Sequence, residues 1–171
     1  MYFSFTDLQL FESAVPTTRL TVFPKFTEKE EHFMAAEENK AVISTFVEEV
    51  INQGQLERAD DLVAVDFVEV DPLPGQQQGR EGLKQVINAF RTAFPDIHWV
   101  IDEMVGEGEK VFSRFTWHGT HRGEFFGVPA TGKHITVKGM VVDRVVAGKM
   151  AESQILMDGL SMMRQLGVIP G

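Results

Sequence analysis

The sequence predicts an α+β fold in which helices come first and a mainly antiparallel sheet follows. After residue 37, apolar side chains first recur at the i, i+3, i+4 spacing of amphipathic helices. Further along, four segments alternate as half-buried strands do, and short Gly-containing turns connect two pairs of them. Helices followed by such a strand meander are typical of domains whose helices cover one face of a sheet.

Three helices are predicted before the four-strand region. The first begins at Glu37 and ends near Gly54, a second short one spans residues 56–63, and the third spans Gly82–Phe94. Pro95 ends the third helix because proline cannot continue a helical hydrogen-bond ladder. The apolar face of the first helix consists of Val42, Ile43, Phe46, Val47, Val50 and Ile51.

Five strands and a closing helix complete the expected order. Asp66–Asp71 alternates as a strand and is ended by the turn-forming residues of Asp71–Gly75. The turns at 106–110 and 147–149 are short enough for hairpins. Apolar residues between Leu160 and Val168 suggest the closing helix. The remaining four strands are predicted at Ile97–Val105, Val111–Thr120, His134–Arg144 and Met150–Asp158.

Residues 1–37 form a region separate from the domain at 38–171. Tyr2, Phe3, Phe5 and Leu8 make it too apolar for a disordered tail. One interpretation is an extension that packs on the surface of the domain or on a second subunit. The other is a lid over the mouth of a pocket, and the sequence does not distinguish between the two. It lacks the basic start and continuous apolar run of a signal peptide.

Composition excludes several classes of function. The chain has 171 residues, which is most simply one domain, and its 16 basic against 25 acidic residues give a net charge of −9. This charge, with scattered basic residues, argues against nucleic-acid or anionic-membrane partners. There is no cysteine, which excludes thiol chemistry and disulfides. No apolar run approaches the roughly 20 residues of a membrane span, so a cytoplasmic location is expected.

The long Gly-studded segment Gly119–Lys133, with the turn at Val145–Met150, resembles the SnoaL-like polyketide cyclases. These belong to the nuclear transport factor 2-like cone folds. The resemblance covers about residues 38–171, and further landmarks are Asp66–Gly75, Phe90–Asp96 and Arg164–Val168. It implies a strongly curved antiparallel sheet wrapped around helices to form a pocket. It also implies a homodimer through the open sheet face, with no cofactor.

Three positions depart from the family pattern. The resemblance places the catalytic aspartate and its assisting histidine of the aromatic polyketide cyclases at Ile155 and Val141, and a frequent histidine of the first strand at Val70. Aliphatic side chains cannot transfer protons, so the usual acid–base mechanism is missing at its usual positions. All three residues, together with Phe46 and Phe90, are expected to contact an apolar ligand in the pocket.

Arg114 and His118 are candidate catalytic residues. Alternation sets them on one strand face with Thr116, and the resemblance implies that this face looks into the cone and contacts substrate. Arg114 and His118 could then polarise a carbonyl group or transfer a proton. Alternatively, Arg114 makes a structural pair with a carboxylate and His118 lies at the solvent-exposed rim.

Asp143 is the third catalytic candidate, because it shares a strand face with Val141. A carboxyl group among apolar side chains has a raised pKa and can act as a general acid or base. The alternative is an ion pair with Arg144 or Lys149. Glu69 and Asp71 would form a carboxylate pair only if their face were interior. With Val70 inside, as the family pattern favours, both are surface residues.

No metal or nucleotide site is expected. His118 and His121 are three residues apart on a strand and point to opposite faces, and no third ligand is evident. The main hypothesis is a cofactor-independent cyclase or isomerase acting on an apolar polyketide- or terpenoid-like molecule. The alternative is a non-catalytic protein that binds such a molecule. Hydrolysis by an activated water is least supported, since Arg114 and Asp143 supply only part of an Asp-Arg-Asp cluster.

Overall fold

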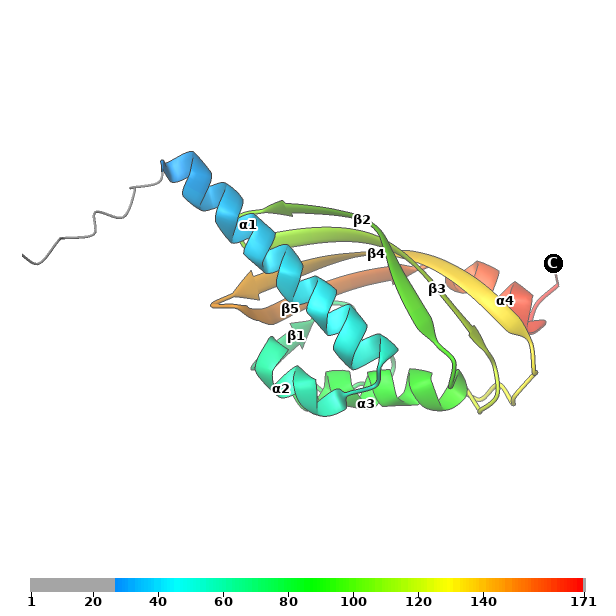
Figure 1. Cartoon of the computed structure of the whole chain (residues 1–171). Helices are drawn as coiled ribbons and strands as arrows, with labels where there is room; N and C mark the ends of the chain where they lie inside the picture. Colours follow the sequence, from blue (N-terminus) through cyan, green and yellow to red (C-terminus); the bar gives the residue numbers. More distant parts are fainter. Residues whose placement is uncertain (1–26, 171) are drawn as a thin grey trace, which may run out of the picture.

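The computed structural model describes residues 27–170, and it confirms the α+β fold. Helices pack against one face of a curved five-stranded sheet (Figure 1). The proposed strap or lid falls largely on residues 1–26, which lie outside the described residues. Within residues 27–170, no helix combines the length and apolar character needed to cross a membrane.

The sheet has the strand order β1-β5-β4-β3-β2. Strand β1 pairs in parallel with β5, and the other neighbours are antiparallel. The two predicted hairpins, β2–β3 and β4–β5, are both present. The strands are β1 (Val63–Glu69), β2 (His98–Glu107), β3 (Lys110–Thr120), β4 (His134–Val146) and β5 (Lys149–Met157).

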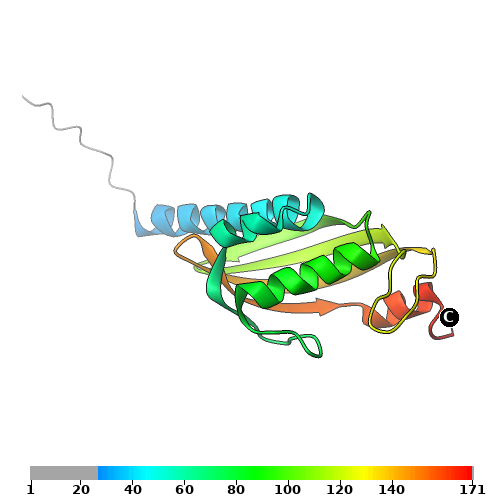
Figure 2. The same ribbon diagram turned by 90° about the horizontal axis from the view of Figure 1, so that it is seen from below.

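The helices lie on the concave side of this sheet. Helix α1 crosses the sheet and α3 lies beneath it beside β1, while α4 and the loop at 121–133 lie together at the far end (Figures 1 and 2). The helical segments are α1 (Glu28–Thr45), a π-helix (Phe46–Asn52), a 3₁₀ turn (Leu56–Arg58), α2 (Ala59–Leu62), α3 (Gly79–Ala93) and α4 (Gly159–Leu166).

Helix α1 begins earlier than the predicted start at Glu37. Thr27 and Glu30 form a capping box, in which each side chain bonds to the backbone amide of the other. The first turn of α1 is exposed and polar, and the apolar Phe33 and Met34 that follow are adjacent and exposed, so this segment adds no helical apolar periodicity to the sequence. The boundary predicted at residue 37 therefore falls inside a continuous helix.

The end of the first helix is wound as a π-helix and is fixed to the sheet. The Asn52 side chain accepts a hydrogen bond from the Trp99 backbone N–H at 2.8 Å and donates one to the Trp99 carbonyl at 3.1 Å. The Arg91 guanidinium donates to the carbonyl oxygens of Ile51 and Asn52 at 2.6 and 3.0 Å. These bonds satisfy helix-end carbonyls, and they hold Trp99 of β2 against the π-helix.

Gly139 of β4 leaves room for an aromatic ring. It pairs with Phe115 on β3, and a Cβ atom at this position would collide with the Phe115 ring and lie 2.8 Å from the Leu156 carbonyl oxygen. The Phe115 ring therefore covers the glycine and stacks on Trp99 with the ring centroids 4.2 Å apart.

We predict that Gly139→Ala destabilises the fold by about 1–3 kcal/mol, because the added methyl group overpacks a filled site. In a chain of this size, that lowers the melting temperature by about 2–4 °C per kcal/mol. Gly159→Ala is the matched control, since a Cβ there meets no described atom within 4 Å. Equal melting temperatures for the two variants would contradict the prediction.

Candidate active site

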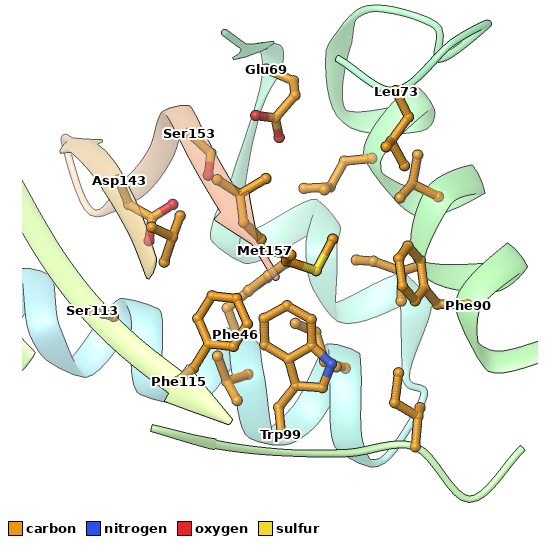
Figure 3. Close-up of a pocket in the computed structure, with 18 of the residues that line it drawn as sticks. Phe46, Glu69, Leu73, Phe90, Trp99, Ser113, Phe115, Asp143, Ser153 and Met157 are labelled. Atoms are coloured by element: carbon orange, nitrogen blue, oxygen red, sulfur yellow. The ribbon is translucent and has the colours of Figure 1, made fainter. Parts of the chain in front are cut away.

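A cavity of about 410 Å³ lies between the concave face of the sheet and the helices. Its volume is within the range of small-molecule sites. Rings and aliphatic chains from all parts of the fold form most of its wall, and Figure 3 shows how they converge. The principal apolar residues on the wall are Phe46, Phe67, Phe90, Trp99, Phe115, Phe125, Val141, Ile155 and Met157.

Asp143 is the most buried acidic group on the cavity wall. It lies on β4 opposite Ser153 of β5, and only 2% of its surface is exposed. Burial raises the pKa of its carboxyl group to about 7, and a hydrogen bond with the Ser153 side chain opposes this rise only in part. Its Oδ1 atom has no hydrogen-bond partner among the described residues.

Glu69 supplies a second carboxyl group from the end of β1. It is paired in register with the same Ser153, so the two acids flank one serine across three strands (Figure 3). The pKa of Glu69 is raised to about 7, mainly by burial and also by the nearby charge of Asp143. Backbone hydrogen bonds at Asp71 and Ile155 oppose the shift.

Together, Glu69 and Asp143 can hold a proton between them near neutral pH. Two interacting carboxyl groups lose their protons in two steps that belong to the pair. The ionised form of Asp143 disfavours ionisation of Glu69, so one group is a base while the other remains an acid. Ser113 of β3 adds a buried hydroxyl group to the same wall, and its oxygen has no described partner.

The prediction that Arg114, Thr116 and His118 look into the cone is wrong. All three lie on the convex face of β3, outside the cavity wall. Arg114 lies 3.3 Å from Asp102, and Thr116 donates a 2.8 Å hydrogen bond to the same carboxylate. The alternation was predicted correctly but its phase was not, because Phe115 and Trp117 occupy the buried face.

Val70 also lies outside the cavity, with 43% of its surface exposed. Its neighbours Glu69 and Asp71 line the wall instead, so the less favoured interpretation of this strand is the one observed. Burial of Phe67 explains why Glu69 and Asp71 face the cavity, because residues two and four positions further along a strand lie on the same face as Phe67. Phe46, Phe90, Val141, Ile155 and Asp143 all lie on the wall as expected.

His121 anchors the loop at 121–133. Its ring is fully buried, stacks on Phe94 with the centroids 5.1 Å apart, and bonds through Nδ1 to Thr131. Burial lowers the pKa of His121, which favours its neutral form. His118 lies on the convex face between His98 and His134. In the part of the chain that the structure describes, no three His, Asp or Glu side chains are arranged to hold a metal ion.

A curved sheet that encloses an apolar cavity with its helices defines the cone fold of the nuclear transport factor 2-like proteins. The chain belongs to the SnoaL-like polyketide cyclase family, whose model matches residues 41–166. This range contains every residue described above on the cavity wall. Among proteins of curated function, none matches the sequence significantly.

Solved structures agree with this membership. IdmH of Streptomyces antibioticus, a proposed polyketide cyclase, is 30% identical, with a TM-score of 0.66 over 75% of this chain and 98% of that chain. A proposed polyketide cyclase of Bacillus cereus is 29% identical, with a TM-score of 0.69 over 84% and 87%. AclR of Streptomyces galilaeus, a proposed hydroxylase, is 24% identical, with a TM-score of 0.70 over 80% and 85%, a likeness in fold alone.

The pH dependence of stability tests the burial of Asp143. The folded pKa of about 7 exceeds the ordinary 3.8, so the folded state binds this proton more tightly. The contribution of Asp143 to the free energy of unfolding is then most favourable below about pH 4, falls as the pH rises, and is lower by up to about 4 kcal/mol above pH 7. The Asp143→Asn variant has no carboxyl group to ionise at this position. The melting temperature of the variant minus that of the wild type should therefore increase between pH 4 and pH 8. Parallel profiles from thermal unfolding would contradict the burial of an ionisable carboxyl group.

Proposed function

We propose that the protein is a cofactor-independent cyclase or isomerase that acts on an uncharged, apolar molecule of the polyketide or terpenoid type. One observation supports this function above the others: two carboxyl groups with pKa values near 7 lie on the wall of a mainly apolar cavity. Acid and base groups are most effective when their pKa values lie near the working pH.

In the proposed reaction, the Asp143 carboxylate removes a proton from a carbon next to a carbonyl group and produces an enolate. The enolate carbon forms a bond to a second carbonyl carbon of the same molecule, and the electron pair of that carbonyl moves to its oxygen. The oxygen takes the proton of the Glu69 carboxylic acid. The product has the composition of the substrate, and passage of the proton from Asp143 to Glu69 restores the pair.

The apolar wall contributes by orienting the substrate. A molecule folded so that its reacting carbons lie in contact has lost most of the entropy that ring closure otherwise costs, an effect of up to about 7–11 kcal/mol. Removal of water also strengthens the interaction of both acids with the developing charges. No step in this reaction needs a metal ion or a redox cofactor.

A non-catalytic binding protein is the second candidate. The aliphatic side chains of Val141 and Ile155 on the wall favour it, because they occupy positions where the family's aromatic polyketide cyclases have polar groups. A site that only binds apolar molecules gains nothing, however, from burying Asp143 and Glu69, since burial of an ionisable group costs stability. The two carboxyl groups therefore favour the enzyme.

The enzyme hypothesis predicts a loss of turnover in isosteric variants of the two acids. Asp143→Asn and Glu69→Gln should each lower kcat by about 10²–10⁴-fold, whereas Arg114→Ala and His118→Ala on the convex face should stay within about twofold. The assay uses an uncharged aromatic diketone whose carbonyl groups lie within ring-closing reach. Ring closure is followed by mass spectrometry, and exchange of the α-proton in D₂O by NMR.

The pH profile provides the control. Because the pair must hold one proton, kcat/KM should fall on both sides of about pH 7. Proton exchange that is unchanged in Asp143→Asn, or a flat profile in the wild type, would rule out the proposed roles and leave the binding protein as the better hypothesis.

We also propose that two copies associate through the convex face of the sheet. Met140, Val142 and Leu156 form an apolar patch there, and 74% of the Leu156 surface is exposed. Arg114 with its acidic partners lies on one side of the patch, and Arg144 lies beside Glu109 and Glu152 near the hairpin ends. A face with both signs of charge around an apolar centre can match a second copy of itself about a twofold axis.

Light scattering after gel filtration tests this association. The wild-type chain should elute with twice the mass of one chain, and Leu156→Arg should elute as a single chain with an unchanged melting temperature of the monomer fold. Phe33→Arg, at an exposed apolar position of helix α1 and away from the convex face of the sheet, is the control and should keep the dimer. A wild-type chain that is monomeric at 100 µM, about the highest concentration the assay needs, would contradict the proposal.

A further inference from the structure

The cavity is bordered by a large aromatic residue in a strained backbone conformation. Phe126 has a φ angle of +47°, and Ala147 at +49° is the other non-glycine residue with a positive φ in the described part of the chain. Bulky side chains rarely adopt this conformation, because the Cβ atom crowds the backbone. Phe126 lines the cavity, and yet 60% of its surface is exposed.

Ala147 and Phe126 have the same local geometry. Both occupy the first central position of a tight turn followed by a glycine with a positive φ, at Gly148 and Gly127. Around Phe126, the backbone groups of Phe125 and Val128 exchange hydrogen bonds of 3.0 and 2.9 Å. Two-residue turns of this type favour asparagine or aspartate before the glycine. A phenylalanine at this position is therefore not explained by the turn.

Packing within the protein does not compensate for this strain either. The Phe126 ring contacts the Phe125 ring edge to face, with centroids 4.5 Å apart, but most of its surface remains open to solvent. Phe125, by contrast, is buried and packs edge to face on Phe90 and Phe94 at 4.8 and 5.3 Å. The base of the turn is thus rigid, and it presents the exposed Phe126 ring where the cavity meets solvent.

We propose that Phe126 is a ligand-binding residue that covers the outer end of a molecule bound in the cavity. Its ring completes the apolar wall only when a ligand is present, so the ligand supplies the burial that the free protein lacks. The inference rests on the proposed function only for the nature of the ligand, an uncharged molecule. It adds that the outer end of this molecule, away from Asp143, is apolar and flat enough to contact an aromatic ring.

The test measures binding of N-phenyl-1-naphthylamine, an uncharged aromatic probe that fluoresces in apolar sites, to the full chain. Phe126→Asn removes the ring but suits the positive φ. We expect the Kd to rise by about three- to tenfold, mainly through faster dissociation in stopped-flow measurements. The melting temperature should stay the same or rise by about 2–4 °C, because the strain is relieved.

Two matched variants separate ring loss from strain relief. Ala147→Asn relieves the same strain in the β4–β5 turn, so it should raise the melting temperature without changing the Kd. Phe126→Tyr keeps the ring and should bind the probe within about twofold of the wild type. The probe undergoes no reaction in the site, so its Kd is measured independently of the turnover assay, and failure of either test leaves the other interpretable.

Three results would overturn the proposal. The first is a Phe126→Asn variant with a Kd within twofold of the wild type. The second is a fall in melting temperature of more than about 5 °C that accompanies its weaker binding, since the ring would then be structural. The third is absence of probe binding by the wild-type chain.

Discussion

The phase of side-chain alternation in the curved sheet is the constraint on which the rest of this structure depends. Each strand has one set of side chains on the concave side and one on the convex side, and a shift of one residue exchanges the two sets. On β3 the buried set contains Phe115 and Trp117, whose size requires burial. That choice directs Arg114 and His118 to the convex face. On β4 the same constraint brings Asp143 inside with Val137 and Val145.

Much of the fold could be predicted from sequence periodicity, but the position of several site residues could not. The spans of β2 to β5 and the faces of β4 and β5 follow from alternation, and so does the interior position of Asp143, whereas β1 begins at Val63 and not at the predicted Asp66. For β3, the resemblance to known cyclases pointed to the wrong face, although Phe115 and Trp117 already indicated the right one. Glu69 was assigned to the surface for a similar reason, although burial of Phe67 was the signal that its face is interior. The π-helix and the strain at Phe126 leave no periodic pattern, because both depend on tertiary contacts.

In the proposed mechanism, the proton-transfer groups lie at positions other than those that the resemblance to the aromatic polyketide cyclases implies, on the same fold. Asp143 lies two residues beyond Val141 on the same strand, so it keeps the same face and lies about one side chain further along the wall. On the antiparallel strand β5, Ser153 lies two residues before Ile155 and pairs with Asp143, so it is displaced along the wall in the same direction. Glu69 comes from a neighbouring strand and approaches Asp143 through the register that both share with Ser153. A group placed two residues further along a strand stays on the same face of the sheet, so a proton-transfer group at either position can reach the same cavity.

Three unfavourable features of the described chain lie at this one cavity. Burial of Asp143 and Glu69 opposes their ionisation, and a positive φ at a bulky residue such as Phe126 costs about 1–3 kcal/mol. Natural domains are stable by only about 5–15 kcal/mol, so such costs are large. Had the cavity lost its function, replacement of the acids by valine or leucine and of Phe126 by asparagine would be stabilising and simple. The presence of Asp143, Glu69 and Phe126 on one cavity wall therefore argues for a site that binds a ligand and transfers protons to or from it.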